Sequence, residues 1–158
     1  MRIENYSAQE LFQRLNDVDE TSNVEAKALS KDSSRSIMET VCSFSNEPGL
    51  GGGVILLGVA ENDEPGGTPY RVEEIVDTDK VQLDLATQCA SMFNFPVRPE
   101  ITVDKIDGLN VLKIFVPELP ASRKPLYFPK DGLPKGIYRR IGSSDQRCTE
   151  DDLYVFYS

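Results

Sequence analysis

The sequence predicts an α+β domain built from short helices and short strands. Residues 54–59 are apolar almost throughout, which is typical of a strand buried on both faces of a sheet. Two β-rich segments flank Asp107-Gly108, and this dipeptide is a strong signal of a hairpin. Other segments repeat apolar residues at helical spacing behind a capping residue, which indicates helices.

The first half of the chain contains two predicted helices and two predicted strands. Ser7 and Glu10 have the spacing of a capping box, in which each side chain bonds the backbone of the other residue. In chain order we expect a helix from Ser7 to about Asn16, a strand over 24–29, a helix from Ser33 or Ser34 to Asn46, and the strand over 54–59.

The second half opens with an acidic segment rich in glycine and proline, over 61–69, which predicts a surface loop. We then expect a helix from Asp77 or Thr78 to Asn94, strands over 101–106, 111–116 and 137–141, and a last helix from Thr149. That helix stops within its apolar pattern at Tyr157-Ser158. This suggests the N-terminal domain of a longer protein, or a helix that packs against a partner subunit in a homo-oligomer.

The length of 158 residues fits one domain, and we expect residues 1–158 to form a single cooperative unit. The longest apolar run is too short to cross a bilayer, and the N-terminus has no apolar signal region. The three cysteines are odd in number and far apart in the sequence, which favours reduced thiols over disulfides or zinc ligands. The sequence therefore predicts a cytoplasmic protein with no membrane contact.

The composition excludes several kinds of chemistry. The chain contains no histidine, so catalysis by Ser-His-Asp or Cys-His groups is excluded within it, as is a histidine metal site. It has 26 acidic and 17 basic residues and a net charge of −9, so any phosphate-binding site must be local. The glycines at 49–53 precede a strand and no lysine follows them, which favours a tight turn over a P-loop.

Three motifs follow one another along the chain: E-T-S-N-V-E-A-K at 20–27, S-F-S-N at 43–46 leading to Gly58-Val59, and Y-R-R-I-G-S-S at 138–144. This ordered series resembles the AlbA-like domain of the Schlafen family over residues 20–152. The resemblance implies a compact α+β fold with a mixed or antiparallel sheet and three to four helices. It also implies a role in binding nucleic acid, either DNA or RNA.

In some vertebrate members of that family the domain is a metal-dependent ribonuclease that uses three acidic residues. Two of these match Glu20 and Glu25, and the third matches Glu61 or Asp63, between which the motif does not choose. Carboxylates are the ligands that Mg²⁺ or Mn²⁺ prefers, so Glu20, Glu25 and Glu61 are the candidate metal ligands. Lys27 shares a strand face with Glu25 and is expected to contact phosphate or to neutralise the acids. Solvated surface carboxylates are the plain alternative.

A basic cluster late in the acidic chain is the candidate nucleic-acid surface. Seven of the 17 lysines and arginines lie within 25 residues: Arg123, Lys124, Lys130, Lys135, Arg139, Arg140 and Arg147. Tyr138 lies among them, and arginines that bind phosphate beside aromatic side chains that stack on bases are typical of nucleic-acid sites. The residues predicted to bind nucleic acid are Arg123, Lys124, Lys135, Tyr138, Arg140 and Arg147. An edge strand protected by positive charge is the alternative.

Three functions remain open at this point. The favoured one is a nucleic-acid-binding domain of a prokaryotic-type regulator of transcription. The second is a metal-dependent endoribonuclease that uses Glu20, Glu25, Lys27 and either Glu61 or Asp63. The third is a domain for protein interaction or oligomerisation without nucleic-acid binding, which the net charge of −9 favours.

Overall fold

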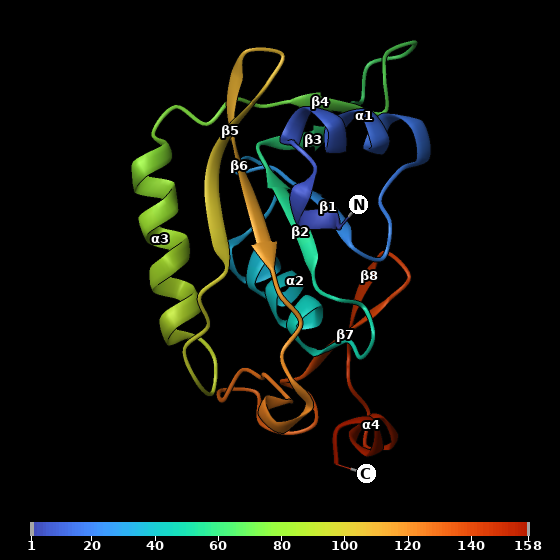
Figure 1. Cartoon of the computed structure of the whole chain (residues 1–158), viewed down its shortest axis with the longest axis vertical. Helices are drawn as coiled ribbons and strands as arrows, with labels where there is room; N and C mark the ends of the chain where they lie inside the picture. Colours follow the sequence, from blue (N-terminus) through green and yellow to red (C-terminus); the bar gives the residue numbers. More distant parts are fainter. Residues whose placement is uncertain (1, 158) are drawn as a thin grey trace.

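The computed structural model in Figure 1 describes residues 2–157. The helices are α1 (Ala8–Val18), α2 (Ser34–Asn46), α3 (Thr78–Ser91) and the short α4 (Tyr154–Tyr157). The strands are β1 (Val24–Lys27), β2 (Gly53–Leu57), β3 (Val59–Glu61), β4 (Tyr70–Val72), β5 (Glu100–Ile106), β6 (Leu109–Val116), β7 (Tyr138–Ile141) and β8 (Ser144–Arg147). The predicted α+β class is confirmed.

The central sheet has four strands in the order β1-β2-β6-β5. It is mixed, because β1 pairs with β2 in parallel whereas β2, β6 and β5 pair antiparallel. Two smaller hairpins, β3-β4 and β7-β8, lie beside it. The predicted hairpin at Asp107-Gly108 joins β5 to β6, and both residues have positive φ, as a tight hairpin turn requires.

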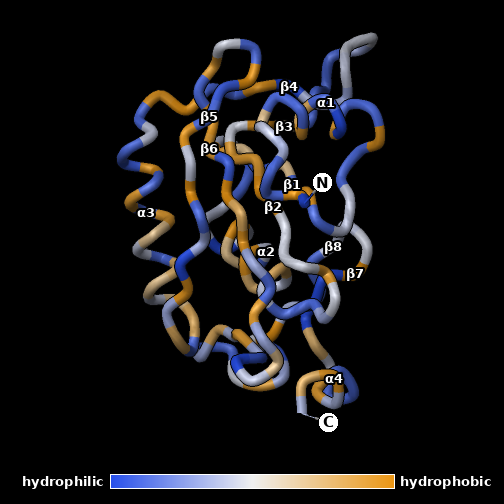
Figure 2. The backbone as a smooth tube through the Cα atoms, in the orientation of Figure 1, coloured by the Kyte–Doolittle hydropathy of each residue, from blue (hydrophilic) through white to orange (hydrophobic). Residues whose placement is uncertain are grey.

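The central strand β2 explains why the sheet is covered on both sides. Its residues alternate between two cores: Ile55 and Leu57 pack with α2 and α3, whereas Val54 and Leu56 pack with α1. Figure 1 shows α3 lying alongside β5 and β6. In Figure 2 the loop between β3 and β4 has hydrophilic to neutral colours, as the predicted surface loop requires.

The capping residues define where the helices begin. Ser7 and Glu10 form the predicted capping box of α1, Ser33 rather than Ser34 caps α2, and Asp77 caps α3. The C-terminal segment differs from the prediction. In place of one helix from Thr149, a 3-10 turn over Asp151–Leu153 leads into the four-residue α4.

The apolar run at 54–59 does not form one strand, and this part of the prediction is wrong. Gly58 has a φ of 108°, a conformation that side-chain-bearing residues rarely adopt, and it separates β2 from β3. After this bend β3 pairs with β4, a strand that the sequence pattern did not reveal. The segment after Gly142 likewise forms β8, a strand that the sequence analysis did not predict.

The glycine-rich segment before β2 allows close packing of the backbone. A Cβ atom on Gly52 would lie 2.1 Å from the carbonyl oxygen of Val116, so only glycine fits beside β6. Cys42, Cys89 and Cys148 are free and buried. Among residues 2–157, none of the helices has the length and apolar character needed to cross a bilayer.

Candidate functional site

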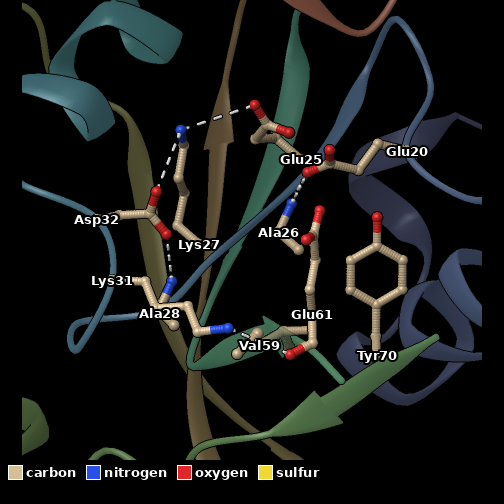
Figure 3. A pocket seen from close by; sticks show the side chains of 11 residues that line it. Glu20, Glu25, Ala26, Lys27, Ala28, Lys31, Asp32, Val59, Glu61 and Tyr70 are labelled. Atoms are coloured by element: carbon tan, nitrogen blue, oxygen red, sulfur yellow. Dashed lines mark hydrogen bonds and ion pairs between the residues drawn. The ribbon is translucent and has the colours of Figure 1, made fainter. Parts of the chain in front are cut away.

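A cavity of about 250 Å³ lies between the free edge of β1 and the β3-β4 hairpin. Figure 3 shows the side chains around it, most of which are charged. The acidic side chains that line it are Glu20, Glu25, Asp32 and Glu61, and the basic ones are Lys27 and Lys31. The structure thus brings together most residues of the predicted acidic site.

Two of these carboxylates bind the backbone at the edge of β1. The Ala26 N–H donates to Glu20 Oε2 at 2.9 Å, and the Ala28 N–H donates to Asp32 Oδ2 at 2.8 Å. Both N–H groups belong to the side of β1 that has no neighbouring strand, where unpaired groups invite another chain. Glu20 and Asp32 therefore satisfy this edge and are held in place at the cavity wall.

Glu25 and Lys27 lie on the same face of β1, as their spacing predicted, and both are buried. Lys27 Nζ lies 3.7 Å from Glu25 Oε1 and donates to Ser36 Oγ at 2.9 Å. Burial, together with a hydrogen bond and like charge from Glu20, raises the pKa of Glu25 to about 9, although Arg140 and Lys27 act in the opposite direction. The Glu25 carboxyl is therefore protonated at neutral pH.

The raised pKa of Glu25 makes the stability of the fold depend on pH. Because the pKa of Glu25 is raised from its ordinary 4.5 to about 9, its stabilising contribution is complete below about pH 4.5 and is lost as the pH rises toward 9. Replacing Glu25 by glutamine keeps the neutral form at every pH. We expect the free energy of unfolding of the native chain to fall, relative to Glu25→Gln, by more than about 1 kcal/mol over this range.

Urea unfolding of both proteins at several pH values between 4.5 and 9 would measure this difference. All other titrating groups are common to the two chains, so their effects largely cancel. A difference that stays constant with pH would show that Glu25 is ionised throughout and paired with Lys27 and Arg140.

The structure separates the two candidates for the third acid. Glu61 ends β3 and lines the cavity, where Figure 3 shows its carboxylate directed toward Ala26 and Glu20. The Asp63 side chain is 83% exposed and pairs with Lys31 at 3.2 Å. In this structure, residues 2–157 contain no group of three acidic or cysteine side chains that could hold a metal ion. The metal ligand set stays a prediction.

Part of the late basic cluster is internal, which corrects the expected surface for Lys124, Tyr138 and Arg140. The side chain of Arg140 is fully buried, and its guanidinium lies 2.9 Å from Asp145 Oδ1 and 3.4 Å from Glu25 Oε1. The Lys124 ammonium lies 2.6 Å from Glu118 Oε2 with a side chain only 6% exposed. Tyr138 packs in the core. These three residues hold the fold together and do not reach the surface where nucleic acid would bind.

The remaining members of the cluster divide into paired and unpaired residues. Arg139 forms two hydrogen bonds with the carboxylate of Glu47, at 3.1 and 2.8 Å. Arg147 is exposed and donates to the Tyr138 hydroxyl at 2.9 Å. Arg123, Lys130 and Lys135 are also exposed, and none of the three makes an ion pair within the described part of the chain.

Arg98 joins this unpaired set, although the sequence reasoning missed it. It is exposed in the linker between α3 and β5, and it lines one hollow together with Arg123. The Asn94 N–H donates to the Tyr127 carbonyl oxygen at 3.0 Å, which ties the linker to the segment 117–136.

Figure 1 shows the α3-β5 linker and the segment 117–136 at one end of the molecule. We call this surface the basic end; its residues are Arg98, Arg123, Lys130 and Lys135. The prolines around Arg98 were the only sequence signal, because they mark an exposed loop.

The fold defines an α+β domain whose mixed sheet lies between helices on both faces. The chain belongs to the Schlafen AlbA_2 family, whose model matches residues 20–149. It is similar to the N-terminal domain of a protein from Nitrosomonas europaea that is named for its relation to the ATP-dependent DNA helicase RecG. That solution NMR structure is 52% identical, with a TM-score of 0.72, and the match covers 91% of this chain and 94% of that one.

A more distant structural likeness is to the DIP2311 protein from Corynebacterium diphtheriae. The identity is 17% and the TM-score 0.55, over 85% of this chain and 23% of that chain. At this identity the likeness shows the fold alone. No curated protein matches the sequence significantly.

Proposed function

We propose that this chain is a nucleic-acid-binding domain that contacts phosphate through the basic end. The observation that carries the proposal is that a chain of net charge −9 leaves Arg98, Arg123, Lys130 and Lys135 exposed and without ion pairs at one end of the molecule. Such unpaired cations attract phosphates by displacing counterions. The Schlafen AlbA_2 family and the RecG-related neighbour support a function connected with nucleic acid.

Neutralising two lysines of the basic end tests this surface. If each lysine contacts one phosphate, Lys130→Gln with Lys135→Gln lowers the slope of log affinity against log salt by about 1.4–1.8. Fluorescence anisotropy of labelled tRNA and of duplex DNA in EDTA would measure it. The matched control is Lys80→Gln with Lys105→Gln, which removes the same charge from exposed positions on α3 and β5. Equal slopes for both double variants would exclude the basic end as the phosphate contact.

The metal-dependent endoribonuclease stays a prediction from the family resemblance. Glu20, Glu25 and Glu61 do line one cavity. As placed, however, the buried Glu25 carboxyl has a raised pKa and Lys27 Nζ lies 3.7 Å from it, so the residues do not fit a metal ion without rearrangement. The geometry therefore favours binding over cleavage. Cleavage of RNA that requires Mn²⁺ and is lost in Glu25→Gln would establish the enzyme.

The finer parts of the prediction also stay proposals. They are the choice between DNA and RNA, a role in regulating transcription, a cytoplasmic location and a homo-oligomer. The exposed side chains of Tyr154, Val155 and Tyr157 on α4 are compatible with contact to another chain. A domain for protein interaction alone would show no nucleic-acid binding even at low salt.

A further inference from the structure

A second hollow, of about 260 Å³, opens at the basic end between the α3-β5 linker and the segment that follows β6. Its walls include the apolar side chains of Phe95, Val97 and Leu119 and the two arginines Arg98 and Arg123. Phe95, Val97 and Leu119 pack against the main core and yet remain partly exposed. The hollow therefore joins an apolar wall to two positive charges.

The arginines are placed to bind an anion. The Arg123 guanidinium lies 4.6 Å from the centroid of the Phe95 ring, and such stacking uses the face of the guanidinium. The N–H donors at its edge make no hydrogen bond within residues 2–157, and the same holds for Arg98. No acidic residue lines the hollow.

The nearest acid in the sequence is directed elsewhere. Glu118 lies between two residues that line the hollow, but its carboxylate accepts from Lys124 Nζ at 2.6 Å and from the Gly51 N–H at 2.8 Å. Its charge is therefore compensated by partners outside the hollow. An anion bound to the two arginines would meet little repulsion from this carboxylate.

Backbone hydrogen bonds hold the walls in position. The Val97 N–H donates to the Cys89 carbonyl oxygen at 3.0 Å, and the Leu119 N–H donates to the Ser45 carbonyl oxygen at 2.9 Å. The two wall segments are thus anchored to buried residues near the C-terminal ends of α3 and α2. A preformed site loses less conformational entropy when a ligand binds, which favours affinity.

We propose that this hollow binds one unstacked base of a single-stranded nucleic acid, while Arg98 and Arg123 bind an adjacent phosphate. The inference rests on the proposed function and narrows it to single strands. The volume is below the roughly 300–1,000 Å³ of sites for drug-sized ligands, so it suits a single ring system. Bases in a duplex are stacked and paired, whereas bases of single strands are free to stack on protein side chains.

Anisotropy with a labelled single-stranded RNA and with a duplex of the same sequence, at low salt in EDTA, tests the inference. We expect Arg98→Gln with Arg123→Gln to weaken single-strand binding at least tenfold, and Phe95→Leu to weaken it about fivefold or more, the lower range for loss of one stacked base. Lys80→Gln with Lys105→Gln is the matched charge control. The two arginines are exposed, so their replacement leaves the core intact, and thermal unfolding checks Phe95→Leu.

The outcomes separate this inference from the proposed function. Single-strand binding that is stronger than duplex binding and is lost in the arginine variant supports both. If the native chain binds but the arginine variant matches its control, the hollow is not the site, while nucleic-acid binding stands. If the arginine variant weakens single strands and duplex equally, the arginines contact phosphate only and base binding is overturned. If the native chain binds neither ligand, both proposals fail.

Discussion

Replacing Arg140 by methionine is expected to lower the free energy of unfolding by about 3–5 kcal/mol, the range for breaking a buried ion pair by removal of one partner. The Arg140 side chain has no exposed surface, and its guanidinium is 2.9 Å from Asp145 and 3.4 Å from Glu25. It also donates to the carbonyl oxygens of Thr21 and Ser22, each at 3.0 Å. Without it, Asp145, whose side chain is only 11% exposed, loses its ion-pair partner, and the segment before β1 loses its anchor to β7.

Urea denaturation measured by circular dichroism would determine this loss. Arg147→Met is the matched control, because Arg147 lies on the neighbouring strand β8 but is exposed. Its side chain donates one partly exposed hydrogen bond, to the Tyr138 hydroxyl, so Arg147→Met is expected to cost about 1 kcal/mol or less. Similar losses for the two variants would show that Arg140 is not the buried counter-ion that the structure describes.

Replacing Asn46 by alanine is expected to lower the free energy of unfolding by about 2–5 kcal/mol, because each buried group left without a partner costs about 1–3 kcal/mol. Asn46 has no exposed surface. Its amide donates to the Leu126 carbonyl oxygen at 2.8 Å and accepts from the Leu126 N–H at 2.7 Å. It also donates to the Tyr138 carbonyl oxygen at 3.2 Å. One side chain therefore joins the end of α2 to two distant segments.

The chain offers a matched control at Asn94. This asparagine makes the same kind of bridge, accepting from the Tyr127 N–H and donating to the Pro125 carbonyl oxygen, but it is exposed. Water can replace its hydrogen bonds, so Asn94→Ala is expected to cost about 1 kcal/mol or less. Thermal or urea unfolding would compare the two. A smaller loss for Asn46→Ala than for Asn94→Ala would contradict the role assigned to burial.

Local signals in the sequence predicted most of the fold because the physical causes are local. Ser7 and Glu10 cap α1 through atoms three residues apart, and the positive φ angles at Asp107-Gly108 suit a preference of these two residue types themselves. The bend at Gly58 was missed for a different reason. A glycine within an apolar run is compatible with a continuous strand, and the bend depends on pairing between β3 and β4.

The candidate site could be predicted only in part. The two-residue period of a strand placed Glu25 and Lys27 on one face, but only the path of the chain after Gly58 brings Glu61 to the cavity and leaves Asp63 outside it. The family resemblance supplied the pair Glu20 and Glu25. The sequence pattern contained no sign that burial raises the pKa of Glu25.

The prediction of a basic surface was wrong for residues whose acidic partners lie far away in the sequence. A cluster of lysines and arginines shows the charge of a segment, not its exposure. Arg139 is paired with Glu47, which is 92 residues away, and Arg140 with Glu25, which is 115 residues away. Arg98 was overlooked because it joins the basic end only through the folded path of the α3-β5 linker. Long-range pairing of this kind follows from the tertiary structure.

The most direct test of nucleic-acid binding is fluorescence anisotropy of the native chain with labelled tRNA and with duplex DNA, in EDTA, as salt is raised from a low concentration. The proposal predicts saturable binding at low salt that weakens steeply as salt increases and does not need a metal ion. Unchanged anisotropy of both nucleic acids at every protein concentration would contradict it and would leave a protein-interaction domain as the remaining function.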